Sequence, residues 1–115
     1  MSNFVRVKEN FEFRRAYKKG TSLVTPFAVV YVTKNRTSNI RLGITAGKKI
    51  GKAVQRNRAK RVIRAAFREL LPSLIAGYDY IIVARVKILT VKSTVVKDAL
   101  RKAFASADLL RTENE

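Results

Sequence analysis

The sequence predicts a single α+β domain in which three helices lie on a small β-sheet. Two kinds of apolar pattern lead to this prediction. Spacings of three or four residues indicate helices, and alternating or continuous apolar runs indicate strands. In chain order the segments are helix 10–20, strands 27–34 and 40–46, helix 54–71, strand 78–86 and helix 93–104.

The chain length is enough for one hydrophobic core. At 115 residues, one domain is expected over residues 1–110, and the polar end at 111–115 is expected to be a frayed tail. The first helix follows Asn10, a residue type that caps helices, and Gly20 is expected to end it in a left-handed conformation.

The two strands in the first half of the chain are separated by the turn-forming residues 35–39. Strand 27–34 is rich in β-branched and aromatic residues, and strand 40–46 alternates between apolar and other side chains. A tight turn between them favours an antiparallel pair.

The second helix is the clearest element, because its apolar positions repeat with helical spacing until Pro72 prevents continuation. The strand at 78–86 has a continuous apolar centre, which is typical of a strand inside a sheet rather than at its edge. Ser93 is expected to cap the last helix.

The composition combines ordinary hydrophobicity with a large positive charge. Hydrophobic residues make up 47% of the chain, and 25 Lys and Arg face 8 Asp and Glu, a formal charge of +17. Such a surface attracts polyanions, so nucleic acid is the first expected partner class and an anionic membrane surface the second.

Several functions are excluded or disfavoured by residue usage. The chain has no Cys and no His, which removes disulfides, thiol nucleophiles and imidazole bases. Its acids form no metal-nuclease motif, so no catalytic or metal-binding side chain and no small-molecule substrate is predicted. No window reaches the roughly 18 apolar residues needed to span a bilayer, and no signal peptide is recognisable; a cytoplasmic protein is expected.

The second helix carries a basic ridge opposite its apolar stripe. No acid interrupts the run from Lys48 to Arg68, so like charges repel unless a polyanion binds there. The alternative is an ordinary solvated helix face. The ridge consists of Arg56, Lys60, Arg61, Arg64 and Arg68, and Lys48, Lys49 and Lys52 in the preceding loop are expected to extend it.

Two further features near this helix have open interpretations. Asn57 could cap the helix start, or it could contact a nucleotide or a hydrated metal ion. Gly47 and Gly51 lack the spacing of a nucleotide-triphosphate loop, so they are expected to let the lysine-bearing loop approach a nucleic-acid backbone.

Aromatic residues form a possible second site. Phe13 and Tyr17 share one helix face, and Tyr31 lies in the middle of a strand. In a small domain such residues usually belong to the core, and the functional alternative is a stacking surface for unpaired bases.

The segment RNRAKRVIRAAFRE, preceded by LGITAGKKIGKAV, resembles the protein subunit of bacterial ribonuclease P, and the likeness extends from residue 11 to residue 85. The resemblance implies an α-β-β-β-α-β-α sandwich with a left-handed βαβ crossover around the basic helix, as in the second domain of a small-subunit ribosomal protein. That order needs one more strand than the apolar patterns give, and we expect it near residues 44–50.

The resemblance also implies a function. In this family a catalytic RNA with Mg²⁺ removes the 5′ leader of precursor tRNA, and the small protein is its cofactor in a 1:1 ribonucleoprotein with one protein copy. The implied contacts to the RNA subunit are Lys48, Lys49, Arg56, Asn57, Arg58, Lys60, Arg61, Arg64 and Arg68, and the implied leader-binding residues are Phe13, Tyr17 and Tyr31. Lys52 is added to the RNA-subunit contacts because it lies in the same lysine-bearing loop. Many relatives have a small hydroxyl residue where this chain has Gly47.

Two other functions remain as alternatives. A structural or chaperone-like RNA-binding protein would share the basic surface but would assist no cleavage. A membrane-active cationic protein would need a free amphipathic helix, whereas the apolar faces here are all needed for one core.

Overall fold

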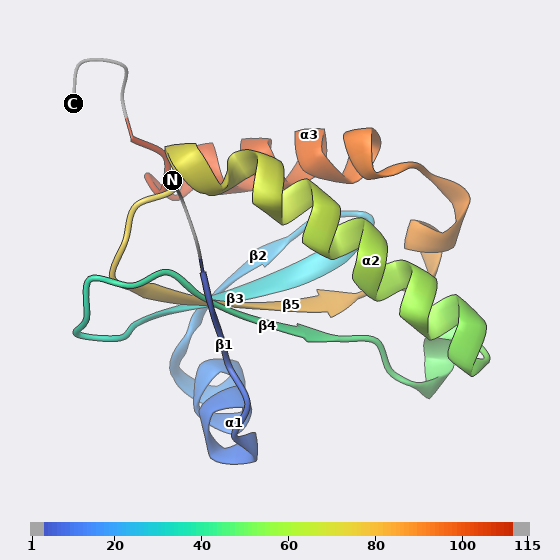
Figure 1. Ribbon diagram of the computed structural model, residues 1–115, viewed down its shortest axis with the longest axis horizontal. Helices are drawn as coiled ribbons and strands as arrows, with labels where there is room; N and C mark the ends of the chain where they lie inside the picture. The colour runs from blue at the N-terminus through green and yellow to red at the C-terminus, as the bar shows by residue number, and fades with distance from the viewer. Residues whose placement is uncertain (1–3, 112–115) are drawn as a thin grey trace.

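The computed structural model describes residues 4–111 and confirms an α+β domain. Three helices and a mixed five-stranded sheet follow the order β1, α1, β2, β3, β4, α2, β5, α3, with α2 and α3 on one face of the sheet and α1 on the other (Figure 1). The helices are α1 (Asn10–Lys19), α2 (Ala53–Leu70) and α3 (Ser93–Ser106). The strands are β1 (Val5–Arg6), β2 (Thr21–Val24), β3 (Ala28–Lys34), β4 (Arg41–Thr45) and β5 (Tyr78–Ala84).

The central position of β5 confirms the prediction of an internal strand. The sheet order is β1-β4-β5-β3-β2, with β5 antiparallel to β3 and parallel to β4. The predicted antiparallel pairing of strands 27–34 and 40–46, which are β3 and β4, is therefore wrong. Tyr80, Ile81 and Ile82 of β5 are all fully buried. An internal strand buries such side chains on both faces of the sheet better than an edge strand does. The connection from β4 through α2 to β5 is the parallel crossover expected for the basic helix.

The additional strand lies elsewhere than predicted. Strand β4 ends at Thr45, and Lys48–Ile50 form a 3₁₀ turn. The missing strand is β2, an antiparallel partner of β3, and the two-residue β1 joins the opposite edge beside β4. With β2 included, the α-β-β-β-α-β-α order is confirmed after β1. Strands this short carry too few residues for a clear alternation in sequence.

The predicted helix caps differ from those in the structure. Glu9 and Lys92 hold the N-cap positions of α1 and α3, so Asn10 and Ser93 are each the first helical residue. Gly20 has φ −74° and is extended, not left-handed, because β2 begins immediately after it. Its lack of a side chain still matters, since a Cβ there would lie 2.5 Å from the Ala16 carbonyl oxygen.

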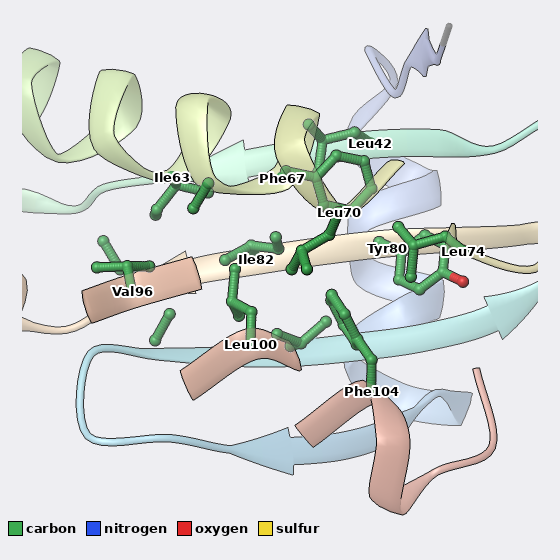
Figure 2. Close-up of a cluster of buried hydrophobic side chains, with 14 of the residues drawn as sticks. Leu42, Ile63, Phe67, Leu70, Leu74, Tyr80, Ile82, Val96, Leu100 and Phe104 are labelled. Carbon is green, nitrogen blue, oxygen red and sulfur yellow. The ribbon is translucent and has the colours of Figure 1, made fainter. Parts of the chain in front are cut away.

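The main core lies between the sheet and the helices α2 and α3. Figure 2 shows Phe67 of α2 and Phe104 of α3 pointing toward Tyr80 of β5. These rings meet edge to face, with Phe67 and Tyr80 centroids 5.5 Å apart. Burial, with a smaller contribution from Tyr78, raises the pKa of the Tyr80 hydroxyl above its usual range, and this hydroxyl donates to the Ile75 carbonyl (3.2 Å).

The polar chain end is only partly described. Of the tail expected at 111–115, residues 112–115 lie outside the described residues. The Arg111 N–H donates to the Ser73 carbonyl oxygen at 2.7 Å, which ties the described end of the chain to the segment after α2. Within residues 4–111, no helix is both long and apolar enough to cross a membrane.

Candidate nucleic-acid interface

The aromatic side chains of α1 border a groove on the face of the sheet opposite α2. Ala16, which is 1% exposed, packs with Ile81 in the small core between α1 and the sheet. Phe13 and Tyr17 lie one turn apart on one flank of α1, as their spacing predicts. With Asn10, Arg14 and Thr45 they line a groove of about 440 Å³.

Phe13 fits against the sheet because Gly43 has no side chain. A Cβ added at Gly43 would lie 2.8 Å from the Phe13 ring and 2.8 Å from Ile81 Cδ1. Phe13 is consequently half-buried in the small core and only partly available to a ligand. The contact joins residues far apart in sequence, and the apolar pattern gave no indication of it.

Tyr31 lies behind Tyr17 and does not line the groove itself. The two rings meet edge to face, with centroids 5.1 Å apart and an interplanar angle of 72°. Tyr17 is 41% exposed, whereas Tyr31 is half-buried in its strand. Of the three predicted leader-binding residues, Phe13 and Tyr17 therefore line the groove, and Tyr31 packs against Tyr17.

Replacing Gly43 with alanine should destabilise the fold and displace Phe13. The new Cβ must push aside the Phe13 ring or Ile81, and overpacking of this kind costs about 1–3 kcal/mol. Gly47→Ala is the matched control, because its Cβ would meet no described heavy atom within 4 Å and its φ is −77°; a change within about 0.5 kcal/mol is expected. Urea unfolding of both variants measures the difference, and equal stabilities would contradict the packing described for Phe13.

Helix α2 begins after a turn that only glycine accommodates. Gly51 has φ +140°, and a Cβ there would lie 2.0 Å from Gln55 Oε1. That oxygen accepts the Lys52 backbone N–H (2.8 Å) and closes the helix start. Asn57 lies in the next turn, exposed, so of its two open interpretations capping of the helix is not observed; contact with a nucleotide or metal ion stays a prediction.

The cations of α2 do not all point straight outward. Arg61 and Arg68 are exposed, but Lys60 and Arg64 are half-buried toward the β1–β4 edge. There they line a hollow of about 140 Å³, whose other lining residues are Phe4, Arg6, Val7, Phe13, Leu42, Gly43 and Ile44. Phe13 thus borders both this hollow and the α1 groove, so the two cavities adjoin at this residue.

Two arginines of α2 have partners within the protein. The Arg68 guanidinium lies over the Phe4 ring, 5.3 Å from its centroid. Arg58 is turned toward the segment before α3, where its Nη2 donates to the Val91 carbonyl at 3.4 Å and its Nη1 is buried without a hydrogen-bond partner among the described residues. Arg58 is therefore partly engaged within the protein, and its RNA contact stays a prediction.

The remaining predicted contacts lie on the 3₁₀ turn and at the start of α2. Lys48 and Lys49 are exposed on the 3₁₀ turn, Lys52 is exposed at the helix start, and Arg56 is half-buried. Within residues 4–111 the four ion pairs are Arg41–Glu12, Arg41–Asp79, Lys97–Glu69 and Arg101–Asp98. None of these ion pairs involves a predicted RNA-binding cation. The charge of the predicted cations is therefore available to an external anion.

Glu12 of α1 and Asp79 of β5 form an internal network with Arg41. Asp79 is 2% exposed, accepts from Asn35 Nδ2 (3.0 Å) and pairs with Arg41 Nη1 (3.4 Å). Arg41 Nη2 pairs with Glu12. The part of the chain that the structure describes contains no group of three or more His, Cys, Asp or Glu placed to hold a metal ion. Glu12 and Asp79 are thus already paired with Arg41.

The comparisons with known proteins agree on one family. The ribonuclease P family model matches residues 1–108. The ribonuclease P protein component of Symbiobacterium thermophilum is 37% identical over 98% of this chain and 99% of its own, and that of Natranaerobius thermophilus is 41% identical over 74% of each chain. The structure of the ribonuclease P protein of Staphylococcus aureus superimposes with a TM-score of 0.82 at 34% identity, and the match covers 95% of this chain and 100% of that protein. The structure of the Thermotoga maritima protein superimposes with a TM-score of 0.76 at 32% identity, and the match covers 84% of this chain and 92% of that protein. The chain therefore belongs to the ribonuclease P protein family.

Proposed function

We propose that this chain is the protein cofactor of a ribonuclease P ribonucleoprotein that removes the 5′ leader from precursor tRNA. The observation that carries the proposal, beside the family, is the position of Phe13, which lines both the hollow that holds Lys60 and Arg64 and the groove beside α1. In this arrangement α2 binds the catalytic RNA, and the groove binds the single-stranded leader.

Helix α2 suits a folded RNA because its guanidinium groups can each bind phosphate through two donors. The helix has no acidic residue before Glu69, and Glu69 itself pairs with Lys97 of α3. Bound phosphates would relieve the repulsion among Lys60, Arg61 and Arg64. Release of counterions from the RNA supplies the free energy, so affinity should fall steeply with salt.

The groove suits unpaired bases because it combines an aromatic wall with a cation. Tyr17 presents an exposed ring, and Arg14 and Asn10 lie along the same groove. Stacking of a base on an aromatic side chain contributes roughly 1–3 kcal/mol and tolerates any base. A leader strand of variable sequence could therefore bind here.

The chemistry is assigned to the RNA, with Mg²⁺ held mainly by RNA groups. The described residues contain no cluster of three or more potential metal ligands, and Glu12 and Asp79 are engaged by Arg41 and Asn35. The protein's part is to neutralise phosphates where the catalytic RNA and its substrate meet, which raises substrate affinity and lowers the Mg²⁺ concentration required. One protein copy per RNA, acting in the cytoplasm, completes the proposal.

Reconstitution tests the proposal against that of a structural or chaperone-like RNA-binding protein. Adding the chain to a bacterial ribonuclease P RNA at low Mg²⁺ should restore cleavage of precursor tRNA at the mature 5′ end. An equally basic, unrelated RNA-binding protein is the control. If both proteins stimulate cleavage equally, or neither does, a specific cofactor role is ruled out.

A further inference from the structure

A basic hollow lies on the other flank of α1, away from the aromatic groove. It has a volume of about 710 Å³ and is lined by Arg15, Lys19, Thr21, Val32, Thr33, Lys34, Asn35, Arg36 and Tyr78. Arg15 and Lys19 each follow a groove residue by two positions, which places them about 200° around the helix from Phe13 and Tyr17. Helix α1 therefore separates two different surfaces.

The four cations of this hollow have no ion-pair partner among residues 4–111. Glu12, on the same helix as Arg15, and Asp79, next to Tyr78, are both engaged by Arg41, and Asp79 also accepts from Asn35. Lys19 is partly explained without a ligand, because a cation in the last turn of a helix is favoured by the helix dipole. Lys34 and Arg36 lie on a strand end and a loop, where that explanation does not apply.

The loop that carries Arg36 is held in a defined conformation. Arg36 has φ +59°, a left-handed conformation that is unfavourable for arginine. Asn35 fixes the loop: its Oδ1 accepts from the Thr37 backbone N–H (2.9 Å), and its Nδ2 donates to the Asn39 carbonyl (3.1 Å). The Gly77 N–H also donates to the Asn39 carbonyl (3.0 Å), which ties the loop to the start of β5.

We propose that this hollow is a separate phosphate-binding site for a single-stranded RNA segment. The volume is within the usual range for ligand sites, about 300–1,000 Å³. Four unpaired cations favour a chain of phosphates, hydroxyls of Thr21 and Thr33 can donate to phosphate oxygens, and the half-buried Tyr78 ring offers a face to a ribose or base. RNA is favoured over an acidic protein because the family assembles with RNA. The site is independent of what occupies the groove beside α1.

Amide NMR of the full chain, titrated with an eight-nucleotide oligouridylate, tests this site. Amides of Lys34, Arg36 and Thr37 report the hollow, and those of Tyr17 and Thr45 report the groove. In Lys34→Gln/Arg36→Asn, shifts of the hollow amides should fall several-fold while groove shifts persist. Asparagine is chosen because it tolerates positive φ. The salt slope of oligouridylate binding should fall by about 1.4, roughly 0.7 for each lost phosphate contact.

The matched control is Lys87→Gln/Lys102→Gln, which removes the same charge from exposed lysines elsewhere. It should retain both sets of shifts and a steeper salt slope than the hollow variant. Lys34→Gln alone serves if the double variant loses its folded spectrum. The proposal is overturned by unshifted hollow amides in the wild-type chain, by equal effects in both variants, or by oligoglutamate of equal charge acting at lower concentration than RNA. If the wild-type chain shows shifts of the hollow amides but none of the groove amides, the result counts against the proposed leader site and not against the hollow.

Discussion

Replacing four cations of α2 with glutamine should weaken binding to ribonuclease P RNA strongly at low salt and little at 1 M salt. Between 1 M and 0.1 M salt, the ratio of wild-type to variant affinity should rise by on the order of a thousandfold. The variant is Lys60→Gln/Arg61→Gln/Arg64→Gln/Arg68→Gln. Each phosphate contact contributes roughly 0.7–0.9 to the salt slope, so four lost contacts should lower it by about 3. Glutamine is nearly as good a helix former as lysine or arginine, so the helix itself should persist. Filter binding from 0.1 to 1 M salt measures both quantities.

The control for this variant removes the same net charge elsewhere. Lys18, Lys87, Lys92 and Lys102 are all exposed and lie outside the α2 ridge. Their replacement with glutamine should reduce affinity only through the overall field, which salt screens within about 10 Å at 0.1 M. If this control loses as much affinity and as much slope as the α2 variant, net charge alone governs binding and α2 has no special role.

The elements of the fold were predictable from sequence where the signal is local. Helix α2 was recognised because Ala59, Ile63 and Phe67 repeat at helical spacing, and all three are buried. Which strands pair is a non-local question. The turn residues 35–39 suggested a hairpin of β3 and β4. Instead, the strongly apolar strand β5 lies between β3 and β4, where it pairs with both. No pattern within either strand contains that information.

The candidate site was predictable to a similar extent. Helical spacing placed Phe13 and Tyr17 on one flank of α1, and the structure shows them lining a common groove. Helical spacing could not reveal that Gly43 makes room for Phe13, because this contact spans about thirty residues of sequence. A helical projection also treats all cations outside the apolar stripe alike. That Lys60 and Arg64 turn toward the hollow at the β1–β4 edge depends on β1, a strand of two residues.

Removing the aromatic wall of the groove should weaken binding of precursor tRNA but not of mature tRNA. In Phe13→Ala/Tyr17→Ala the leader loses its stacking surface, and one lost base contact of roughly 1–3 kcal/mol corresponds to about a five- to 150-fold loss of affinity. Mature tRNA has no leader to lose. Dissociation constants of the reconstituted ribonucleoprotein for the two RNAs measure the difference.

Two further variants separate stacking from stability. Phe13 packs against Ile81, so its removal also disturbs the small core, whereas Tyr17→Ala removes a ring that is 41% exposed and should retain the fold. Phe11 is 57% exposed and does not line the groove, so Phe11→Ala should leave both tRNA affinities unchanged. A loss for precursor tRNA in Tyr17→Ala but not in Phe11→Ala would localise the leader to the groove. Equal losses for precursor and mature tRNA would show instead that α1 contacts the tRNA body, because only that part is common to both RNAs.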